Sequence, residues 1–108
     1  MTSGWAPDAG DIVWMHFDPQ AGHEQAGHRP ALVIAPIHYN RLTGLMLCVP
    51  MTSRVKGFRF EVPVGSSGVA LADQVKSVDW RARKATPKGR ANAAELEAIR
   101  ARVRALVG

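Results

Sequence analysis

The alternation of apolar and polar residues predicts a chain built mainly of short strands. Strand-like runs recur at intervals of roughly 8–12 residues, and turn residues such as Gly44, Gly57 and Gly65 separate them. The predicted strands are residues 11–17, 31–37, 45–52, 58–64, 68–73 and 75–80. Short strands at this spacing are typical of a small barrel or sandwich.

The C-terminal part changes from this pattern to a helical one. Asn92 can cap a helix, and Glu95 follows three residues later, which is the spacing of a capping box. Apolar residues then recur at helical spacing, and the arginines among them leave the apolar stripe. We therefore expect an amphipathic helix over residues 93–107, packed on the sheet. A short helix is also expected around residues 38–42.

Length and composition favour one small domain. The 108 residues fit a single domain spanning residues 1–108, and 46% of them are hydrophobic, which is enough for a small core. Cys48 is the only cysteine, so we expect a buried, inert thiol and no intrachain disulfide. No N-terminal apolar stretch reaches the length of a signal peptide or membrane span, which predicts a cytoplasmic protein without membrane contact.

The charge balance changes this picture by suggesting a polyanionic partner. Fourteen Lys and Arg oppose nine Asp and Glu, giving a net charge of +5. Such an excess favours nucleic acid first and an acidic protein second, although it also serves simple solubility. Two basic clusters carry much of the charge: Arg54, Lys56 and Arg59 in one, and Arg81, Arg83, Lys84, Lys88 and Arg90 in the other. We expect these clusters to bind the phosphate backbone.

Residues 19–30 are unusually rich in reactive side chains for a loop between two predicted strands. The stretch holds His23, Glu24, His28 and Arg29, more than a turn requires. Polar groups on a loop held by a rigid scaffold are typical of a functional site. The planar fork of Arg29 suits phosphate oxygens, although a surface arginine before a proline is the plainer interpretation. His23 and Glu24 are both possible bases. For His28, a loop imidazole that makes one hydrogen bond is the commoner outcome.

The histidines and aromatic residues also bear on metal binding and on base stacking. His16, His23 and His28 with neighbouring carboxylates match no tight metal-ligand spacing, so we expect no metal and no cofactor. The three tryptophans are expected in the core or a dimer interface rather than as stacking platforms. Phe17, beside an Asp-Pro turn, is expected at a rim where it stacks on RNA.

Ordered blocks of the sequence point to a family. Residues 10–14, 18–19, 22–30, 49–52 and 70–77 closely resemble the MazF/PemK family of toxin endoribonucleases, from about residue 10 to the C-terminus. The resemblance implies an SH3-like barrel of the MazF/PemK/CcdB-like fold with a C-terminal helix, acting as a homodimer. It further implies metal-independent, sequence-specific cleavage of single-stranded mRNA, which inhibits translation. The partner would be a cognate acidic antitoxin of MazE type.

The resemblance assigns roles to residues one by one. Arg29 matches the catalytic arginine of the MazF branch, and Thr52 matches the threonine of its Val-Pro-x-Thr block. Without the resemblance, Thr52 is better explained as an ordinary strand residue. His23 matches a histidine of the PemK-like branch, whereas the MazF branch points to Glu24. The choice of base stays open between them.

The sequence around Asp73 distinguishes the PemK-like branch of the family from the MazF branch. Asp73 occupies the position of the catalytic aspartate of the PemK-like branch, which has an arginine two residues earlier, where this chain has Leu71. The departure favours the Arg29 and Thr52 scheme. The expected RNA-binding residues are Phe17, Gln25, His28, Arg54, Lys56, Asp73, Gln74 and Lys76. The alternative function is a catalytically silent nucleic-acid-binding or regulatory module on the same barrel, and the presence of Arg29 and Thr52 argues against it.

Overall fold

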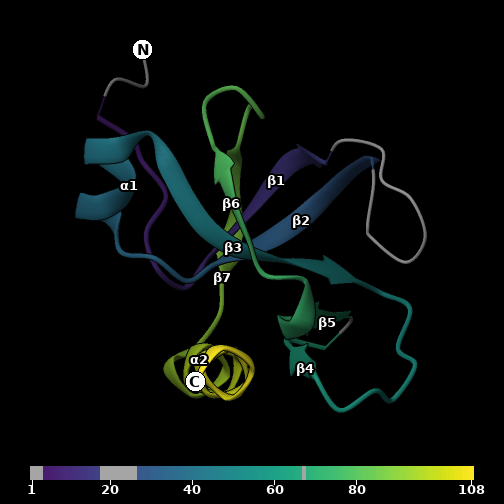
Figure 1. The fold of residues 1–108 in the computed structure, drawn as a ribbon. Helices are drawn as coiled ribbons and strands as arrows, with labels where there is room; N and C mark the ends of the chain where they lie inside the picture. Colours follow the sequence, from purple (N-terminus) through teal and green to yellow (C-terminus); the bar gives the residue numbers. More distant parts are fainter. Residues whose placement is uncertain (1–3, 18–26, 67) are drawn as a thin grey trace.

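The computed structural model describes residues 4–17, 27–66 and 68–108. In these residues it contains seven strands, two α-helices and one 3-10 turn, arranged as a bent sheet with helix α2 against one side (Figure 1). The strands are β1 (Asp11–Phe17), β2 (Gly27–Val33), β3 (Leu45–Thr52), β4 (Glu61–Val64), β5 (Gly68–Leu71), β6 (Lys76–Asp79) and β7 (Thr86–Arg90). The helical elements are α1 (Ile37–Thr43), η1 (Ala72–Gln74) and α2 (Ala93–Val107).

Every strand pairing in this sheet is antiparallel. The strand order is β4-β5-β3-β2-β1-β7, and β6 also pairs with β3. The first half of β3 pairs with β6, and its last two residues pair with β5. Strand β3 therefore connects two parts of a bent sheet, and Thr52 at its C-terminal end belongs to the part formed with β5.

Both faces of the central strands are buried. Because side chains alternate along a strand, β2 sends Ala31 and Val33 into one core and Leu32 into another. The first core contains Trp80, whose ring meets the partly buried Trp5 edge-to-face at 5.7 Å. The second is closed by α2 through Ile99, which is fully buried. The mainly β fold with a C-terminal helix is thus the expected one.

Three predicted elements are confirmed at their expected bounds or within a residue. Strands β1 and β3 and helix α2 match, and α2 begins with the expected capping box between Asn92 and Glu95. The short helix is present as α1, and Gly44 ends it in the left-handed conformation at φ 75°. Of the helices in the described part of the chain, none is both long enough and apolar enough to cross a bilayer.

Other boundaries differ from the prediction for identifiable reasons. Strand β2 begins at Gly27 rather than at residue 31, because its first residues pair with β1 although they are polar. Strand β7 was not predicted, since all its residues are exposed and two of them are Pro87 and Gly89. It forms because β1 offers it a free edge, which is a partner far away in sequence.

Cys48 behaves as its apolar setting predicts. The side chain is fully buried in the first core, and the thiol is free. Burial raises the pKa of Cys48 to about 12, against the smaller opposing effects of Lys76 and Arg83. A thiol with so high a pKa is almost entirely protonated near neutral pH, and it is therefore a poor nucleophile.

Candidate active site

Strand register aligns Arg29 and Thr52 across β2 and β3. The recorded pairs run from Val33 with Cys48 to Ala31 with Pro50. Arg29 stands two residues beyond this last pair on β2, and Thr52 two residues beyond it on β3. Since side chains repeat every second residue, both continue the face of Ala31 and Val33, whereas Trp14, whose register partner is Pro30, belongs to the other face. Residues far apart in sequence are thereby brought to one place.

Thr52 is held firmly at the end of β3. Its side chain is only 6% exposed, and its Oγ1 accepts a hydrogen bond of 3.1 Å from the backbone N–H of Arg54. A hydroxyl has one hydrogen to donate and two lone pairs to accept with, so this contact leaves the hydrogen available. On the neighbouring strand Gly68 leaves room, because a Cβ there would lie 3.1 Å from the Thr52 carbonyl oxygen.

Arg29 and Thr52 line one hollow of about 590 Å³, which we call the Trp14 hollow. Its walls come from β1, β2, β3 and β7, from the turn between β4 and β5, and from the first turn of α2. The polar and aromatic residues that matter here are Trp14, His28, Arg29, Thr52, Lys88, Arg90 and Glu95. The volume lies within the range of about 300–1,000 Å³ that is usual for ligand sites.

Aromatic and cationic side chains stack along one wall of this hollow. The His28 ring of β2 stacks on the Trp14 indole of β1, with centroids 5.3 Å apart and planes at 19°. The His16 ring lies 4.6 Å from that of His28. From the other side of β1, the Lys88 ammonium lies 5.2 Å from the centre of the Trp14 ring. The wall thus combines flat apolar rings with positive charge.

A second hollow of about 440 Å³, the Phe58 hollow, begins on the other side of Thr52. Of the described residues that line the two hollows, Thr52 alone belongs to both. The second hollow brings together four residues predicted to bind RNA: Arg54, Lys56, Asp73 and Gln74. Phe58 adds an exposed ring with the Lys56 ammonium 5.8 Å from its centre. Thr52, whose hydroxyl is the predicted hydrogen-bond donor to phosphate, therefore has a ligand-sized space on either side.

The loop between β3 and β4 is shaped by one carboxylate. Glu61 accepts backbone N–H bonds from Lys56 at 3.2 Å and from Gly57 at 3.0 Å. These bonds fold the loop back on the start of β4, so that its basic side chains border the Phe58 hollow. Leu71 is buried in the wall of this hollow and exposed Asp73 lies on η1 beside it. The position of Leu71 is thus apolar wall, not a source of charge.

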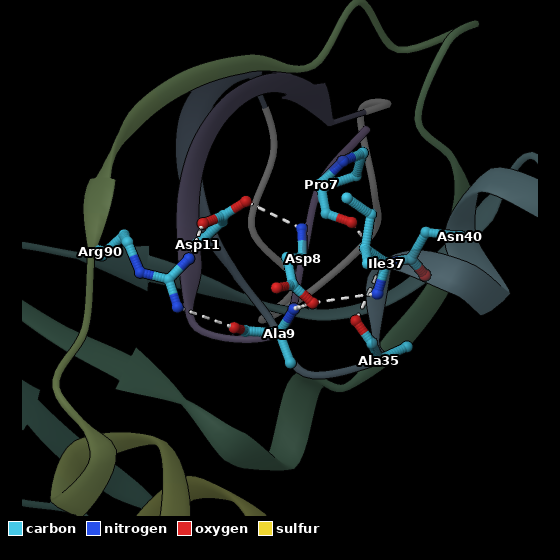
Figure 2. Close-up of polar contacts among 8 residues, drawn as sticks. All are labelled: Pro7, Asp8, Ala9, Asp11, Ala35, Ile37, Asn40 and Arg90. Carbon is cyan, nitrogen blue, oxygen red and sulfur yellow. Dashed lines mark hydrogen bonds and ion pairs between the residues drawn. The ribbon is translucent and has the colours of Figure 1, made fainter. Parts of the chain in front are cut away.

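The wall that carries Lys88 is fixed by a polar network at the start of β1 (Figure 2). Arg90 of β7 forms an ion pair with Asp11, and its Nη2 donates to the Ala9 carbonyl at 3.3 Å. The Asp11 carboxylate also accepts from the backbone N–H of Asp8 at 2.8 Å. Asp8 in turn accepts from the N–H of Ile37 at 3.0 Å, which joins this network to α1. Arg90 belongs to the second basic cluster, which was expected to bind phosphates. Its guanidinium instead holds β7 to the start of β1.

Glu95 closes the opposite end of the Trp14 hollow. Its carboxylate accepts the backbone N–H of Gly65 at 2.8 Å and that of Asn92 at 2.9 Å. These two hydrogen bonds, that from Gly65 first, lower the pKa of Glu95 below its usual value. The carboxylate thereby ties the β4–β5 turn to the start of α2.

The structure corrects one predicted role. Phe17 is 3% exposed and belongs to the first core, so the expectation that its ring stands at a rim and stacks on RNA is wrong. The alternation along β1 explains this, because Val13, Met15 and Phe17 share the buried face. Lys76 lies with its ammonium 5.1 Å from the centre of the Phe17 ring, and it is not among the described residues that line either hollow.

Three predicted residues, His23, Glu24 and Gln25, lie outside the described residues. His28 lies in the Trp14 hollow as part of the ring stack. In the part of the chain that the structure describes, no three His, Cys, Asp or Glu side chains gather as a metal site would require.

Sequence reasoning missed the role of Trp14 and Phe58 in the two hollows. Trp14 alternates with buried Val13 and Met15 and so faces away from the first core, while its expected place in a dimer interface stays a prediction. That alternation was a usable signal. Phe58 gave a weaker one, because an aromatic residue among three basic residues of a loop is typical of nucleic-acid-binding segments.

Comparison with known proteins gives a consistent result. The profile of a family described as the PemK-like, MazF-like toxin of type II toxin-antitoxin systems matches residues 8–107. The endoribonuclease toxin MazF of Escherichia coli K12 is 53% identical over 111 residues, covering 100% of both chains. A crystal structure of MazF from Deinococcus radiodurans superposes with a TM-score of 0.89 at 52% identity, covering 96% of this chain and 98% of that one. MazF in a MazE–MazF structure from the same organism gives a TM-score of 0.85 at 51% identity, covering 96% and 97%.

Proposed function

We propose that this chain, which belongs to the PemK-like, MazF-like family of toxins of type II toxin–antitoxin systems, is the endoribonuclease of such a pair. Its substrate is single-stranded mRNA in the cytoplasm, cut at a preferred sequence, so that translation stops. The acting form is a homodimer. The observation that carries the proposal is the alignment of Arg29 and Thr52 at one hollow, with an available hydroxyl hydrogen on Thr52.

The cleavage uses the 2′-hydroxyl of RNA as its nucleophile. A base takes the 2′-hydroxyl proton, the 2′-oxygen bonds to phosphorus, and the bond from phosphorus to the 5′-oxygen breaks. The departing 5′-oxygen takes up a proton from water, which leaves a cyclic phosphate and a 5′-hydroxyl. No metal is required when side chains supply the base and stabilise the negative charge.

Phosphate binding, stabilisation of the transition-state charge and the base each have a proposed residue. The Arg29 guanidinium binds phosphate oxygens through its planar fork and carries a permanent charge. The Thr52 hydroxyl donates to a non-bridging oxygen, where charge accumulates in the transition state. The base is Glu24 or His23, and we favour Glu24 because the resemblance to the MazF branch points to it.

A partner follows from the same surface. MazE–MazF structures exist for Deinococcus radiodurans, and this chain covers nearly all of that MazF. We propose a MazE-type antitoxin with an acidic, partly disordered segment that occupies the basic hollows. Carboxylates and phosphates are attracted by the same cations, so antitoxin and RNA exclude one another.

The test is cleavage of an oligoribonucleotide pool in the presence of EDTA. We expect products with cyclic phosphate and 5′-hydroxyl ends from the wild-type protein, and none from Arg29→Ala. Arg104→Ala is a matched control, because Arg104 is an exposed arginine on α2 paired with Glu97. Intact RNA with folded wild-type protein would contradict the proposal and favour a binding module.

A further inference from the structure

We propose that the Trp14 indole is a stacking site for one nucleobase of the RNA, next to the phosphate that is cut. This inference rests on the function proposed above and adds to it a residue that binds and positions the RNA. The first argument is position. Trp14, Arg29 and Thr52 all line the Trp14 hollow, although the indole and the Arg29 side chain leave the β1–β2 pair on opposite faces. A strand whose phosphate lies on Arg29 and Thr52 then reaches the indole with a neighbouring nucleotide.

The second argument is the state of the ring. Trp14 is partly exposed on β1, and the His28 ring stacks on it at 5.3 Å from the neighbouring strand. This contact holds the indole in one orientation, so that its stacking surface is formed before RNA binds. A ring fixed in advance loses little conformational freedom on binding, which is what makes aromatic platforms effective.

The third argument concerns Lys88, whose ammonium now lies 5.2 Å from the centre of the indole. A cation over an exposed aromatic ring is a weak contact, whereas stacking of a base is stronger, and an ammonium also binds phosphate well. We infer that the base takes the place of the ammonium, and that Lys88 turns to the adjoining phosphate. β7 itself stays in place because Arg90 and Asp11 fasten it to β1.

The two hollows then divide the RNA between them. Thr52 belongs to both, so the nucleotide on Trp14 and the nucleotides in the Phe58 hollow lie on opposite sides of the phosphate that is cut. Stacking discriminates weakly among bases, because every base has a flat face. Trp14 therefore contributes affinity and sets the position of the strand more than it reads sequence.

The experiment is a double-mutant cycle between the protein and the RNA. The probe is a single-stranded RNA whose cleavage site has been mapped with wild-type protein, made non-cleavable by a 2′-deoxy substitution at the scissile nucleotide. Abasic sites replace its neighbouring nucleotides one at a time. Trp14→Leu should weaken binding of the intact probe about 5- to 30-fold, which corresponds to about 1–2 kcal/mol. One abasic position should cost wild-type protein a similar factor and cost Trp14→Leu almost nothing.

Phe58→Leu is the matched control, because Phe58 is an aromatic residue of the other hollow. It should weaken binding without coupling to the position that Trp14 reads. Penalties that simply multiply for Trp14→Leu at every position would overturn the inference. Failure of wild-type protein to cleave RNA would instead overturn the proposed function, so the two failures are distinguishable.

A measurement on wild-type protein removes any dependence on folding of the variant. Iodouracil is placed at the position where an abasic site costs wild-type protein most on the proposed Trp14 side, and the complex is irradiated. We expect a cross-link to the peptide that contains Trp14, identified by mass spectrometry. Cross-links confined to the Phe58 hollow, or none at all, would overturn the inference.

Discussion

Thr52 offers the sharpest test of the chemistry, because two small substitutions separate its hydroxyl from its shape. Thr52→Val keeps the shape of the side chain and removes the hydroxyl, whereas Thr52→Ser keeps the hydroxyl and removes a buried methyl group. Loss of one transition-state donor costs about 10²–10³ in rate, so we expect Thr52→Val to be slower by this factor. Thr52→Ser should stay within about tenfold of wild type, since its donor is intact.

Stability should not separate these two variants. Thr52→Val loses the hydrogen bond that Oγ1 accepts from the Arg54 N–H, worth about 0.5–1.5 kcal/mol. Thr52→Ser loses burial of one methyl group at a 6% exposed position, about 0.8 kcal/mol. Both values correspond to a fall in Tm of several degrees, about 4–8 °C per kcal/mol for a domain of this size.

The assay is single-turnover cleavage with protein in excess, so that the rate of chemistry is measured apart from binding and product release. Melting curves of both variants provide the control for folding. A Thr52→Val rate close to that of wild type would refute the donor role, because this variant has no hydroxyl at the position. A folded Thr52→Ser as slow as Thr52→Val would show that packing at this position matters instead.

Three further predictions concern charge. Because Glu95 has a lowered pKa in the folded state, its stabilising bonds are present above its unfolded pKa and are lost as pH falls through the folded value. The Tm advantage of wild type over Glu95→Gln should therefore shrink below about pH 4, and a constant difference would contradict this. Glu24→Gln should remove the acidic limb of the pH–rate profile, and an unchanged limb would point to His23. Binding of non-cleavable RNA through four or five phosphates should give a log–log salt slope of about −3, which Lys56→Gln reduces by somewhat under one unit; salt-independent binding would show that the basic loop is ordinary surface.

The sequence predicted well the elements whose signal is a local apolar pattern, and poorly those that depend on pairing with a distant strand. β1, β3 and α2 were predicted well because their apolar periods are long and come from buried faces. β7 has no such period, because its side chains are exposed and only its backbone pairs with a neighbour. That neighbour, β1, is more than seventy residues away in sequence. The site followed the same rule. Arg29 and Thr52 were identified through a family resemblance, and their alignment depends on the register of β2 and β3, which local pattern does not contain.

Phe17 shows how the error over one aromatic residue arose, and Trp14 on the same strand makes the comparison. Both lie on β1, and an aromatic residue next to a turn was assigned to the rim, while a tryptophan within the strand was assigned to a core or interface. The structure buries Phe17 instead and leaves Trp14 partly exposed beside the hollow. Parity along the strand decides the matter, because Phe17 shares a face with Val13 and Met15, whereas Trp14 does not.

The double-sided burial of β2 and β3 has a consequence for mutational tolerance. A slip of one residue between these strands would move small Ala31 to the site of Leu32 and reverse the assignment to the two cores together. Such a slip would disrupt the packing of both cores at once, so an out-of-register pairing of β2 and β3 is strongly disfavoured. Substitutions at Val33 or Val49, which are buried and line neither hollow, act on the same strand register that places Arg29 and Thr52 near one another. Selection for activity in this chain therefore extends into its interior, and we expect volume changes there to appear as losses of turnover before they appear as loss of the fold.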